Sequence, residues 1–331
     1  MRIAFFGTQD YDGAFREFTY EFEFKFLMER LTPRTANLAC GCNAACVFVN
    51  DDVCRESLQI LSECGVKLLL LRCAGFNNVD MKAAKELGVT VLRVPAYSPF
   101  AVAEHAMTII QAANRRIHKG YARVRDNNFS LIGLMGFDLH GKVAGIMGMG
   151  KIGVCMARIC KGYGMDVLAW DPYPKQEYAD EGLVKYVTKE ELYYRADLIS
   201  LHTPLVMGDG GTYHIIDADA IFRMKDRAML VNTSRGALID TEALIEALKN
   251  GKFHAVALDV YEGEDDNVYT NRSDVAIRND ITARLLSFPN VIVSSHQAFF
   301  THEAMQRIAE VTMQNARNYM NGADFGDAEV I

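Results

Sequence analysis

Short apolar runs alternate with amphipathic stretches along nearly the whole chain, and this alternation restricts the fold more than any other feature of the sequence. Short apolar runs bounded by turn residues are typical of buried strands, and apolar residues three and four apart are typical of helices. A chain that alternates the two builds βαβ units around a parallel sheet. In the first third, strands are expected at 3–6, 22–26, 46–49, 67–72 and 89–94, and helices at 54–64 and 79–87.

A second series of such units follows Pro95 and Pro99. Apolar residues at helical spacing predict one long helix over 100–121. Further strands are expected at 143–147, 166–169, 198–201, 229–232, 255–259 and 291–294, and a last helix at 301–320. Six strands suit a doubly wound dinucleotide-binding fold. Because 331 residues suffice for about two domains, we predict an α/β protein with two doubly wound parallel-sheet domains; only 263–279 resembles a long irregular loop.

Charge and hydropathy exclude two classes of partner. The 35 basic and 42 acidic residues give a net charge of −7, which offers no basic field to nucleic acid. No apolar stretch approaches the length of a membrane span, and the N-terminus runs directly into the first expected strand without the features of a secretory signal. We therefore expect a cytoplasmic protein that binds neither nucleic acid nor membrane.

The eight cysteines indicate neither disulfides nor a metal site. Several of them, such as Cys64 and Cys160, stand inside apolar patterns, which favours reduced thiols in a cytoplasm. Cys40, Cys42 and Cys46 form the one local cluster, but it lacks the second pair of ligands that a tetrahedral zinc site needs. No metal is expected.

Gly148, Gly150 and Gly153 form a G-x-G-x-x-G motif in a context that makes it informative. The motif follows an apolar strand and opens a helical pattern, and the next strand ends at Asp171. Such glycines let the backbone approach a pyrophosphate at the helix N-terminus, while the carboxylate accepts hydrogen bonds from a ribose. Because Asp171 would repel a 2′-phosphate and no arginine follows it directly, NAD is favoured over NADP; the alternative is a structural strand-turn-helix without a ligand.

Three further polar residues follow the ends of expected strands: Arg235, Glu264 and His296. An arginine can hold a carboxylate in a fixed fork, and a histidine can exchange the proton that accompanies hydride transfer to a ketone. A carboxylate behind the histidine would orient the ring, and both Glu262 and Glu264 are candidates. Each residue also has a structural alternative, as a surface cation, part of an acidic loop and a core histidine. We expect His105, His202 and His254 to be structural.

The motifs together resemble the D-isomer-specific 2-hydroxyacid dehydrogenases, most closely the fermentative D-lactate dehydrogenases of bacteria. The resemblance covers nearly the whole chain and rests on six segments: LRCAGFNNVD (71–80), RVPAYSP (93–99), GMGKIG (148–153), VNTSRGALID (231–240), ALDVYE (257–262) and SHQAF (295–299). It implies a flavodoxin-like substrate domain over 1–99 and 299–331, with a Rossmann-type NAD domain over 100–298 inserted in it and catalysis in the cleft.

The resemblance also implies roles for individual residues. Arg235 would bind the substrate carboxylate, His296 would be the acid/base, and Glu264 would be its partner. The other implied contacts to substrate are Ala74, Gly75, Tyr97 and Phe299. The implied contacts to the cofactor, besides the three glycines and Asp171, are Lys151, Ile152, Thr203, Pro204, Thr233 and Asp259.

The expected activity is therefore the NADH-dependent reduction of a small 2-keto acid, foremost pyruvate to D-lactate. The alternatives on the same scaffold are dehydrogenases of 2-hydroxyisocaproate or of glyoxylate and hydroxypyruvate. A non-catalytic NADH sensor is the alternative from another class, although it would not need Arg235, Glu264 and His296 together. A homo-oligomer, dimer or tetramer, is expected.

Overall fold

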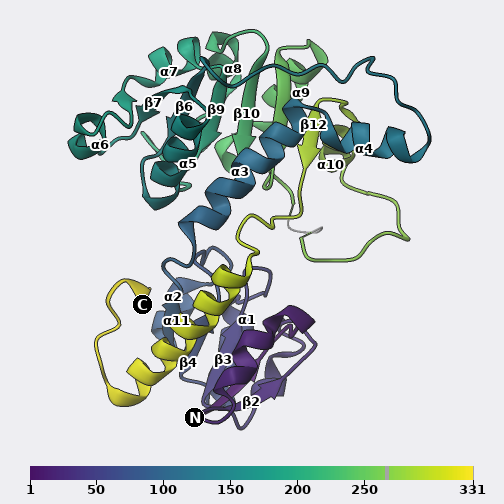
Figure 1. Ribbon diagram of the computed structural model, residues 1–331. Coiled ribbons are helices and arrows are strands. Elements are labelled where there is room, and N and C mark those ends of the chain that lie inside the picture. The colour runs from purple at the N-terminus through teal and green to yellow at the C-terminus, as the bar shows by residue number, and fades with distance from the viewer. Residues whose placement is uncertain (265–267, 331) are drawn as a thin grey trace. The chain divides into compact units, whose positions relative to one another are not determined.

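The computed structural model describes residues 1–264 and 268–330 and divides into two compact units. Unit 1 comprises Met1–Ser98 and Phe300–Ile331, and unit 2 comprises Pro99–Phe299. Each unit is built on its own parallel sheet (Figure 1). The predicted α/β class with two parallel sheets is confirmed.

Unit 1 contains a five-stranded sheet in the order β2-β1-β3-β4-β5. Its strands are β1 (Arg2–Phe5), β2 (Glu23–Phe26), β3 (Ala44–Val47), β4 (Leu68–Leu71) and β5 (Thr90–Arg93). Its helices are α1 (Arg55–Glu63), α2 (Met81–Glu86) and α11 (His302–Asn321), with the 3₁₀ helices η1 (Asp10–Phe18), η2 (Ala36–Ala39) and η4 (Gly326–Ala328). Every residue of β3 and β4 is apolar and buried, as expected for parallel strands covered on both faces.

The C-terminal helix α11 returns to the sheet of unit 1 and packs against β4 and β5 (Figure 1). It begins at Thr301, whose hydroxyl accepts a hydrogen bond from the amide of Ala304, and ends at Gly322 in the left-handed conformation. Its buried residues recur at helical spacing and include Ala304, Ile308, Ala309, Thr312, Met313 and Ala316. The predicted helix at 301–320 is confirmed, and its apolar face explains why it belongs to unit 1.

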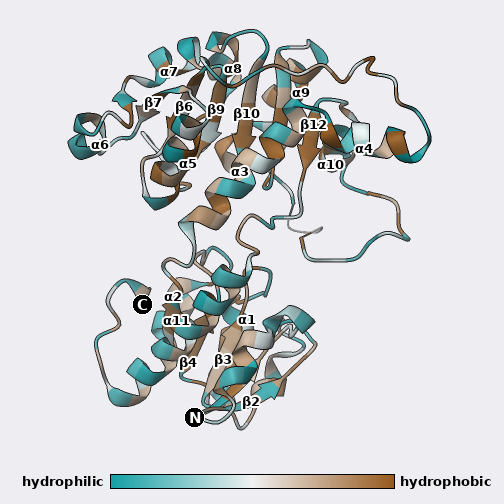
Figure 2. Ribbon diagram, in the orientation of Figure 1, coloured by the Kyte–Doolittle hydropathy of each residue, from teal (hydrophilic) through white to brown (hydrophobic). Residues whose placement is uncertain are grey.

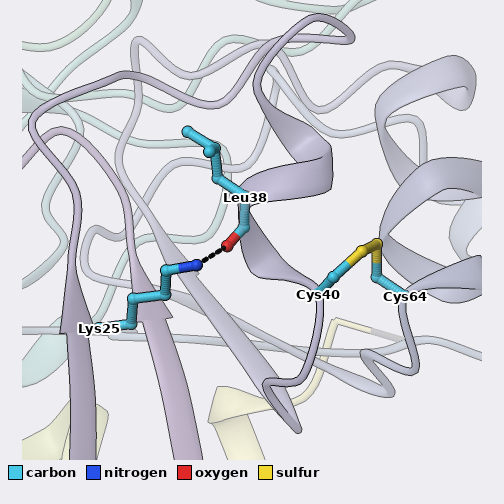
Figure 3. Close-up of a disulfide and its surroundings, with 4 residues drawn as sticks. All are labelled: Lys25, Leu38, Cys40 and Cys64. Carbon is cyan, nitrogen blue, oxygen red and sulfur yellow. Dashed lines mark hydrogen bonds between the residues drawn. A yellow bond between two sulfur atoms is a disulfide. The ribbon is translucent and has the colours of Figure 1, made fainter.

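Two cysteines of unit 1 form a disulfide, which corrects the expectation of reduced thiols. Cys40 follows η2 and Cys64 follows α1, and their Cα atoms lie 4.4 Å apart, within the span of a disulfide. Figure 3 shows the bond beside the hydrogen bond from Lys25 Nζ to the Leu38 carbonyl (2.7 Å). The two cysteines are 24 positions apart in different elements, so only the packing of η2 on α1 reveals the pair. The other six cysteines are free thiols.

Unit 2 contains a seven-stranded sheet in the order β12-β11-β10-β9-β6-β7-β8. Its strands are β6 (Val143–Met147), β7 (Asp166–Trp170), β8 (Lys185–Tyr186), β9 (Leu198–Leu201), β10 (Ala228–Asn232), β11 (Phe253–Leu258) and β12 (Val291–Val293). Its helices are α3 (Pro99–Asn114), α4 (Ile117–Arg125), α5 (Lys151–Gly162), α6 (Gln176–Asp180), α7 (Lys189–Arg195), α8 (Ala218–Arg223), α9 (Thr241–Lys249) and α10 (Asp280–Ser287), with the 3₁₀ helix η3 (Gly236–Leu238). The short edge strand β8 adds a seventh strand to the six expected.

The central strands of unit 2 bury alternate residues in two separate cores. In β10, Met229 and Val231 face the core under α3 and α5, whereas Leu230 faces the core that includes residues of α7, α8 and α9. Figure 2 shows these strands as an apolar layer between helices whose outer surfaces are more polar. Burial on both faces explains the continuous apolar runs from which the strands were predicted.

The single helix expected over 100–121 is instead the two helices α3 and α4. Arg116 stands between them in the left-handed conformation (φ 54°). Its guanidinium donates hydrogen bonds to the carbonyls of Pro289 (3.1 Å) and His254 (3.3 Å), which hold the break in place. The sequence pattern carries no sign of this break because Arg116 is neither glycine nor proline.

The irregular loop expected over 263–279 contains no helix or strand in its described residues, which are all but 265–267. A hydrogen bond from Asn279 Nδ2 to the Gly263 carbonyl (3.2 Å) joins its two ends.

Candidate active site

Polar side chains gather at the carboxyl edge of the sheet in unit 2. Its strands all run parallel, so their carboxyl ends lie along one edge, where open parallel sheets bind ligands. Around β6 the edge carries the glycine motif, with Asp171 after β7 and Thr203 after β9. On the other side, Arg235, Glu264 and His296 follow the neighbouring strands β10, β11 and β12.

The glycine motif forms a tight turn between β6 and α5. Gly148 has a φ of 94°, and a Cβ there would lie 2.7 Å from the backbone of His202. A Cβ at Gly153 would collide with the Gly148 carbonyl, so both glycines are required by the turn itself. Gly150 is different, because a Cβ there would meet no atom within 4 Å. The open space beside Gly150, at the first turn of α5, fits a pyrophosphate that approaches the backbone.

Asp171 is oriented by the glycine turn. Its Oδ2 accepts a hydrogen bond from the amide of Met149 (2.6 Å), and its Oδ1 accepts one from the amide of Tyr173 (2.8 Å). The carboxylate at the end of β7 is therefore held beside the motif, and its remaining lone pairs suit the hydroxyls of a ribose.

Two buried hydroxyls lie next along the edge. The Oγ1 atoms of Thr203 and Thr233 have no hydrogen-bond partner in the described part of the chain, although both residues are buried. A buried hydroxyl without a partner is unfavourable, so a polar ligand at this edge would satisfy both groups. Lys151 and Ile152 open α5, and Pro204 follows Thr203. These residues together fit a dinucleotide.

His296 and Glu264 form the pair expected from the sequence. His296 Nδ1 lies 3.0 Å from Glu264 Oε1, and the two side chains are 27% and 13% exposed. His296 has a left-handed backbone (φ 54°), which is rare outside glycine and is concentrated at functional sites. Of the two acids considered, Glu264 is the partner of His296, and Glu262 pairs with His214 instead (2.8 Å).

The segment that carries His296 is held by Asp259. The Asp259 carbonyl accepts the amide of His296 (3.1 Å), and its carboxylate accepts the amides of Gln297 and Ala298 (both 2.9 Å) and the hydroxyl of Ser294 (2.6 Å). Burial raises the pKa of Asp259, but these bonds and one with His105 outweigh it, so its pKa lies below the ordinary value. The carboxylate thus acts on the His296 segment; its contact with the cofactor remains a prediction.

Arg235 is half-buried and makes no ion pair with any described residue. Its Nη1 donates to the Ser234 carbonyl (2.7 Å), and its own carbonyl accepts a hydrogen bond from Asn232 Nδ2 (2.8 Å). Ser234 Oγ in turn donates to the carbonyl of Thr203 (2.6 Å). The backbone of Arg235 is therefore fixed, while its guanidinium keeps donors for an anion.

The other expected substrate contacts are partly exposed residues. The amides of Ala74 and Gly75, after β4, donate to no acceptor among the described residues. Tyr97 follows β5 in the same unit. Phe299 belongs to unit 2, where its ring packs edge-on against that of Tyr269 (6.4 Å between centroids).

Comparison with known proteins identifies the chain's family. The family model for the NAD binding domain of D-isomer specific 2-hydroxyacid dehydrogenases matches residues 107–298. The D-lactate dehydrogenase of Escherichia coli is 49% identical over 325 residues, which cover 97% of this chain and 98% of that protein. The chain belongs to the D-isomer specific 2-hydroxyacid dehydrogenase family. Unit 2 contains the NAD-binding domain of this dehydrogenase, and its cofactor is NAD.

Solved structures share the fold of this dehydrogenase. The apo-structure of D-lactate dehydrogenase from Escherichia coli has a TM-score of 0.90 at 47% identity and covers both chains completely. The structure reported for the pyruvate reductase of Chlamydomonas reinhardtii has a TM-score of 0.92 at 38% identity and covers 98% of each chain. The fold and family inferred from the motifs are confirmed.

Two contacts of the His296 segment in this dehydrogenase were missed by the sequence analysis. Tyr269, in the loop interpreted as irregular, donates its hydroxyl to the His296 carbonyl (2.8 Å). His105, expected to be only structural, places Nε2 3.1 Å from Ser294 Oγ and 3.3 Å from Asp259 Oδ1. Neither contact has a sequence signal beyond an aromatic residue in a polar loop and a polar residue within an apolar helix.

The other two histidines expected to be structural have protein partners. His202 Nε2 lies 2.8 Å from Ser200 Oγ, and burial lowers the pKa of His202 to about 4. The ring nitrogens of His254 face Asn114 Oδ1 (3.1 Å) and Arg227 Nη2 (3.0 Å), and burial lowers its pKa as well.

Two features are absent from the described residues of the dehydrogenase. None of their helices is both long and apolar enough to cross a membrane. Their His, Cys, Asp and Glu side chains form no group of three or more that could hold a metal ion.

Proposed function

We propose that this protein is a D-lactate dehydrogenase, which reduces pyruvate with NADH. The observation that carries the proposal is the His296–Glu264 pair, whose side chains lie 3.0 Å apart. The two residues follow β12 and β11, and the neighbouring strand β10 leads into Arg235. A proton donor, its orienting carboxylate and a carboxylate-binding cation are the groups that reduction of a 2-keto acid requires. The D-lactate dehydrogenase of Escherichia coli, 49% identical, acts on the substrate that its name states.

NADH, when bound, supplies the hydride that reduces the carbonyl carbon. His296 Nδ1 faces Glu264, so Nε2 is the nitrogen that remains to donate the proton to the carbonyl oxygen. Glu264 fixes the plane of the ring through its contact with Nδ1. The proton and the hydride together convert the ketone to the hydroxyl of the product.

Arg235 orients the substrate in this proposal. Its guanidinium holds the carboxylate in a bidentate fork and polarises the carbonyl oxygen. The unpaired amides of Ala74 and Gly75 are proposed as further donors to the carboxylate, and the rings of Tyr97 and Phe299 as walls around the methyl group. Unit 1 would thus be the substrate domain.

The decisive test is a spectrophotometric assay of NADH loss with pyruvate, followed by determination of the product's configuration. We expect D-lactate, with pyruvate preferred to 2-ketobutyrate by a modest factor, because hydrophobic pockets distinguish one methylene by about 10–200-fold at most. A higher kcat/KM for 2-ketoisocaproate, glyoxylate or hydroxypyruvate would transfer the assignment to that substrate. Binding of NADH without reduction of any 2-keto acid would leave the sensor.

Asp171 is proposed to select NADH over NADPH. Its carboxylate is held at the glycine turn, where it would face a 2′-phosphate with like charge. Asp171→Ser should raise the ratio of kcat/KM for NADPH to that for NADH by more than about tenfold, because removal of a close like charge relieves a cost of several kcal/mol and each 1.4 kcal/mol is about tenfold. Equal use of both cofactors by the unmodified protein would remove this assignment.

We also propose a homo-oligomer that covers the apolar surface of α4 and the loop after it. This surface exposes Ile117 (62%), Tyr121 (65%), Phe129 (70%) and Leu131 (82%) around an apolar hollow of about 500 Å³. Exposed apolar patches of this kind mark interfaces, and a second copy has the same patch to place against it. Light scattering should give at least twice the monomer mass, and Leu131→Glu should reduce it; a monomeric protein would contradict the proposal.

The proposed compartment is the cytoplasm, where NADH and 2-keto acids arise. The Cys40–Cys64 disulfide is the feature at odds with this compartment, because cytosolic thiols are kept reduced. Thiol labelling in freshly lysed cells decides between them: eight reactive cysteines after denaturation support the cytoplasm, and six support an oxidising compartment.

A further inference from the structure

A second histidine–glutamate pair lies directly behind the Arg235 segment. His214 Nε2 lies 2.8 Å from Glu262 Oε1, and Glu262 Oε2 accepts a hydrogen bond from the amide of Thr241 (3.3 Å). His214 Nδ1 faces Asp240 Oδ2 at 3.9 Å. The pair thereby connects three segments of unit 2: the loop that ends at His214, the segment after β11 and the start of α9.

The backbone around His214 is bonded to the residues that follow Arg235. The amide of His214 donates to the Ala237 carbonyl (2.9 Å), and the amide of Ile216 donates to the Leu238 carbonyl (3.0 Å). The amide of Asp240 donates back to the Ile216 carbonyl (3.0 Å). The stretch from Ala237 to Asp240 is therefore paired along its length with the His214 segment.

The backbone around Glu262 is in contact with the same stretch from the other side. A Cβ on Gly236 would collide with the carbonyl of Tyr261 and would lie 2.7 Å from the amide nitrogen of Glu262. Only glycine allows this approach, so the residue that follows Arg235 is packed directly on the residue that precedes Glu262. A displacement of Glu262 would be transmitted to Gly236 and to Arg235.

The surroundings of the His214–Glu262 pair hold it in a fixed geometry. His214 and Glu262 are each about one-quarter exposed, and the ring of Tyr213 stacks on that of His214 (3.9 Å between centroids, 15° between planes). His214 also has a left-handed backbone (φ 49°), a conformation that persists only where the surroundings enforce it. Both of its nitrogens face carboxylates, which leaves none for proton exchange with a substrate.

We propose that His214 and Glu262 are positioning residues that hold Arg235 where it binds the substrate carboxylate. The inference rests on the proposed role of Arg235 and assigns neither residue a contact with the substrate. A bidentate fork depends on the placement of the guanidinium to within a fraction of an ångström. Loss of the His214–Glu262 contact should therefore weaken substrate binding before it affects proton transfer.

Glu262→Ala is the first test variant, and Asp197→Ala is its control. Asp197 is a carboxylate of similar exposure in the same unit, and like Glu262 it contacts one basic side chain, that of Lys225 (2.9 Å), and one backbone amide, that of Val143 (2.8 Å). It precedes β9, at the opposite edge of the sheet from Arg235. The two substitutions therefore remove equivalent contacts with and without a connection to the site.

We expect Glu262→Ala to raise the KM for pyruvate about tenfold while kcat stays within about threefold, the effect of losing one charged hydrogen bond from a binding geometry. The affinity for NADH should not change. Glu262→Gln should restore most of the loss, because its amide oxygen still accepts from Thr241. His214→Ala should reproduce the rise in KM, which keeps the proposal testable if Glu262→Ala does not fold. A KM unchanged in both alanine variants, or raised equally by Asp197→Ala, would overturn it.

Hydrogen exchange gives a readout that does not depend on activity. Amides in the segment 236–240 should exchange about tenfold faster in Glu262→Ala than in the unmodified protein, and at an unchanged rate in Asp197→Ala. Unchanged exchange in Glu262→Ala would contradict the proposal that the His214–Glu262 pair holds this segment. If the unmodified protein reduces no 2-keto acid, the proposed function fails, and the exchange measurement still decides whether this pair holds the segment.

Discussion

The two histidine–glutamate pairs of unit 2 have the same composition, similarly exposed histidine side chains and the same left-handed backbone at the histidine. They differ in what the second ring nitrogen meets. Among the described residues, His296 has a partner for Nδ1 alone, which is Glu264, whereas His214 has one nitrogen that faces Glu262 and another that faces Asp240. Reactivity in such a pair therefore depends on a donor left without a protein partner, which burial alone does not reveal.

The largest difference should come from the same substitution at the two histidines. His296→Gln should lower kcat by about 10²–10⁴-fold, because no other described group is placed to donate the proton, and leave NADH binding intact. His214→Gln should keep kcat within about threefold, since its amide can still donate to Glu262. Steady-state kinetics and NADH fluorescence titration measure both, and a loss of kcat at His214 as large as that at His296 would abolish the distinction.

Substitution of Arg235, the residue that the His214–Glu262 pair is proposed to hold in place, should have the next largest effect. Arg235→Lys should raise the KM for pyruvate by more than about tenfold, because a point charge does not reproduce the bidentate fork. Its effect on KM should exceed that of Glu262→Ala, which only displaces the guanidinium. A smaller KM in Arg235→Lys than in Glu262→Ala would contradict the order of roles.

The two glutamates should differ in their effect on kcat. Glu264 orients the ring of His296, so Glu264→Gln should lower kcat with pyruvate by about tenfold, the effect of losing one charged hydrogen bond. Glu262→Gln should leave kcat within about threefold of the unmodified value. Steady-state kinetics with pyruvate measure both, and an unchanged kcat in Glu264→Gln would remove Glu264 as the partner.

Substitution of His202, which has no carboxylate partner in the described part of the chain, should have the smallest effect on activity and should change the stability instead. Burial lowers the pKa of His202 to about 4 in the folded state, against an ordinary value near 6.5. The unfolded chain thus binds the proton first, and the stability that the neutral ring contributes above pH 6.5 is lost as pH falls toward 4. Between pH 6.5 and pH 4, the free energy of unfolding measured in urea should fall by about 1–3 kcal/mol less in His202→Gln than in the unmodified protein. An equal fall in both proteins would contradict this prediction.

The sequence predicted those residues of the candidate site that directly follow the ends of strands. A parallel sheet brings all strand ends to one edge, so Gly148, Asp171, Arg235 and His296 could be grouped without a structure, each being next to an apolar run. The choice between Glu262 and Glu264 could not be made in this way. The two acids are two residues apart on one loop, and only the fold of that loop shows which histidine each one meets.

Local pattern alone determined the α/β class, the two series of parallel strands, the dinucleotide turn and the residues at its edge, because periodicity and turn chemistry act over a few neighbouring residues. Tertiary structure decided what depends on distant partners. The break at Arg116 is held by carbonyls more than a hundred positions away, and the Cys40–Cys64 bond depends on the packing of η2 on α1. Tyr269 and His105 contact the His296 segment only in the folded protein, because a local sequence pattern does not encode a contact between residues that are far apart in the chain.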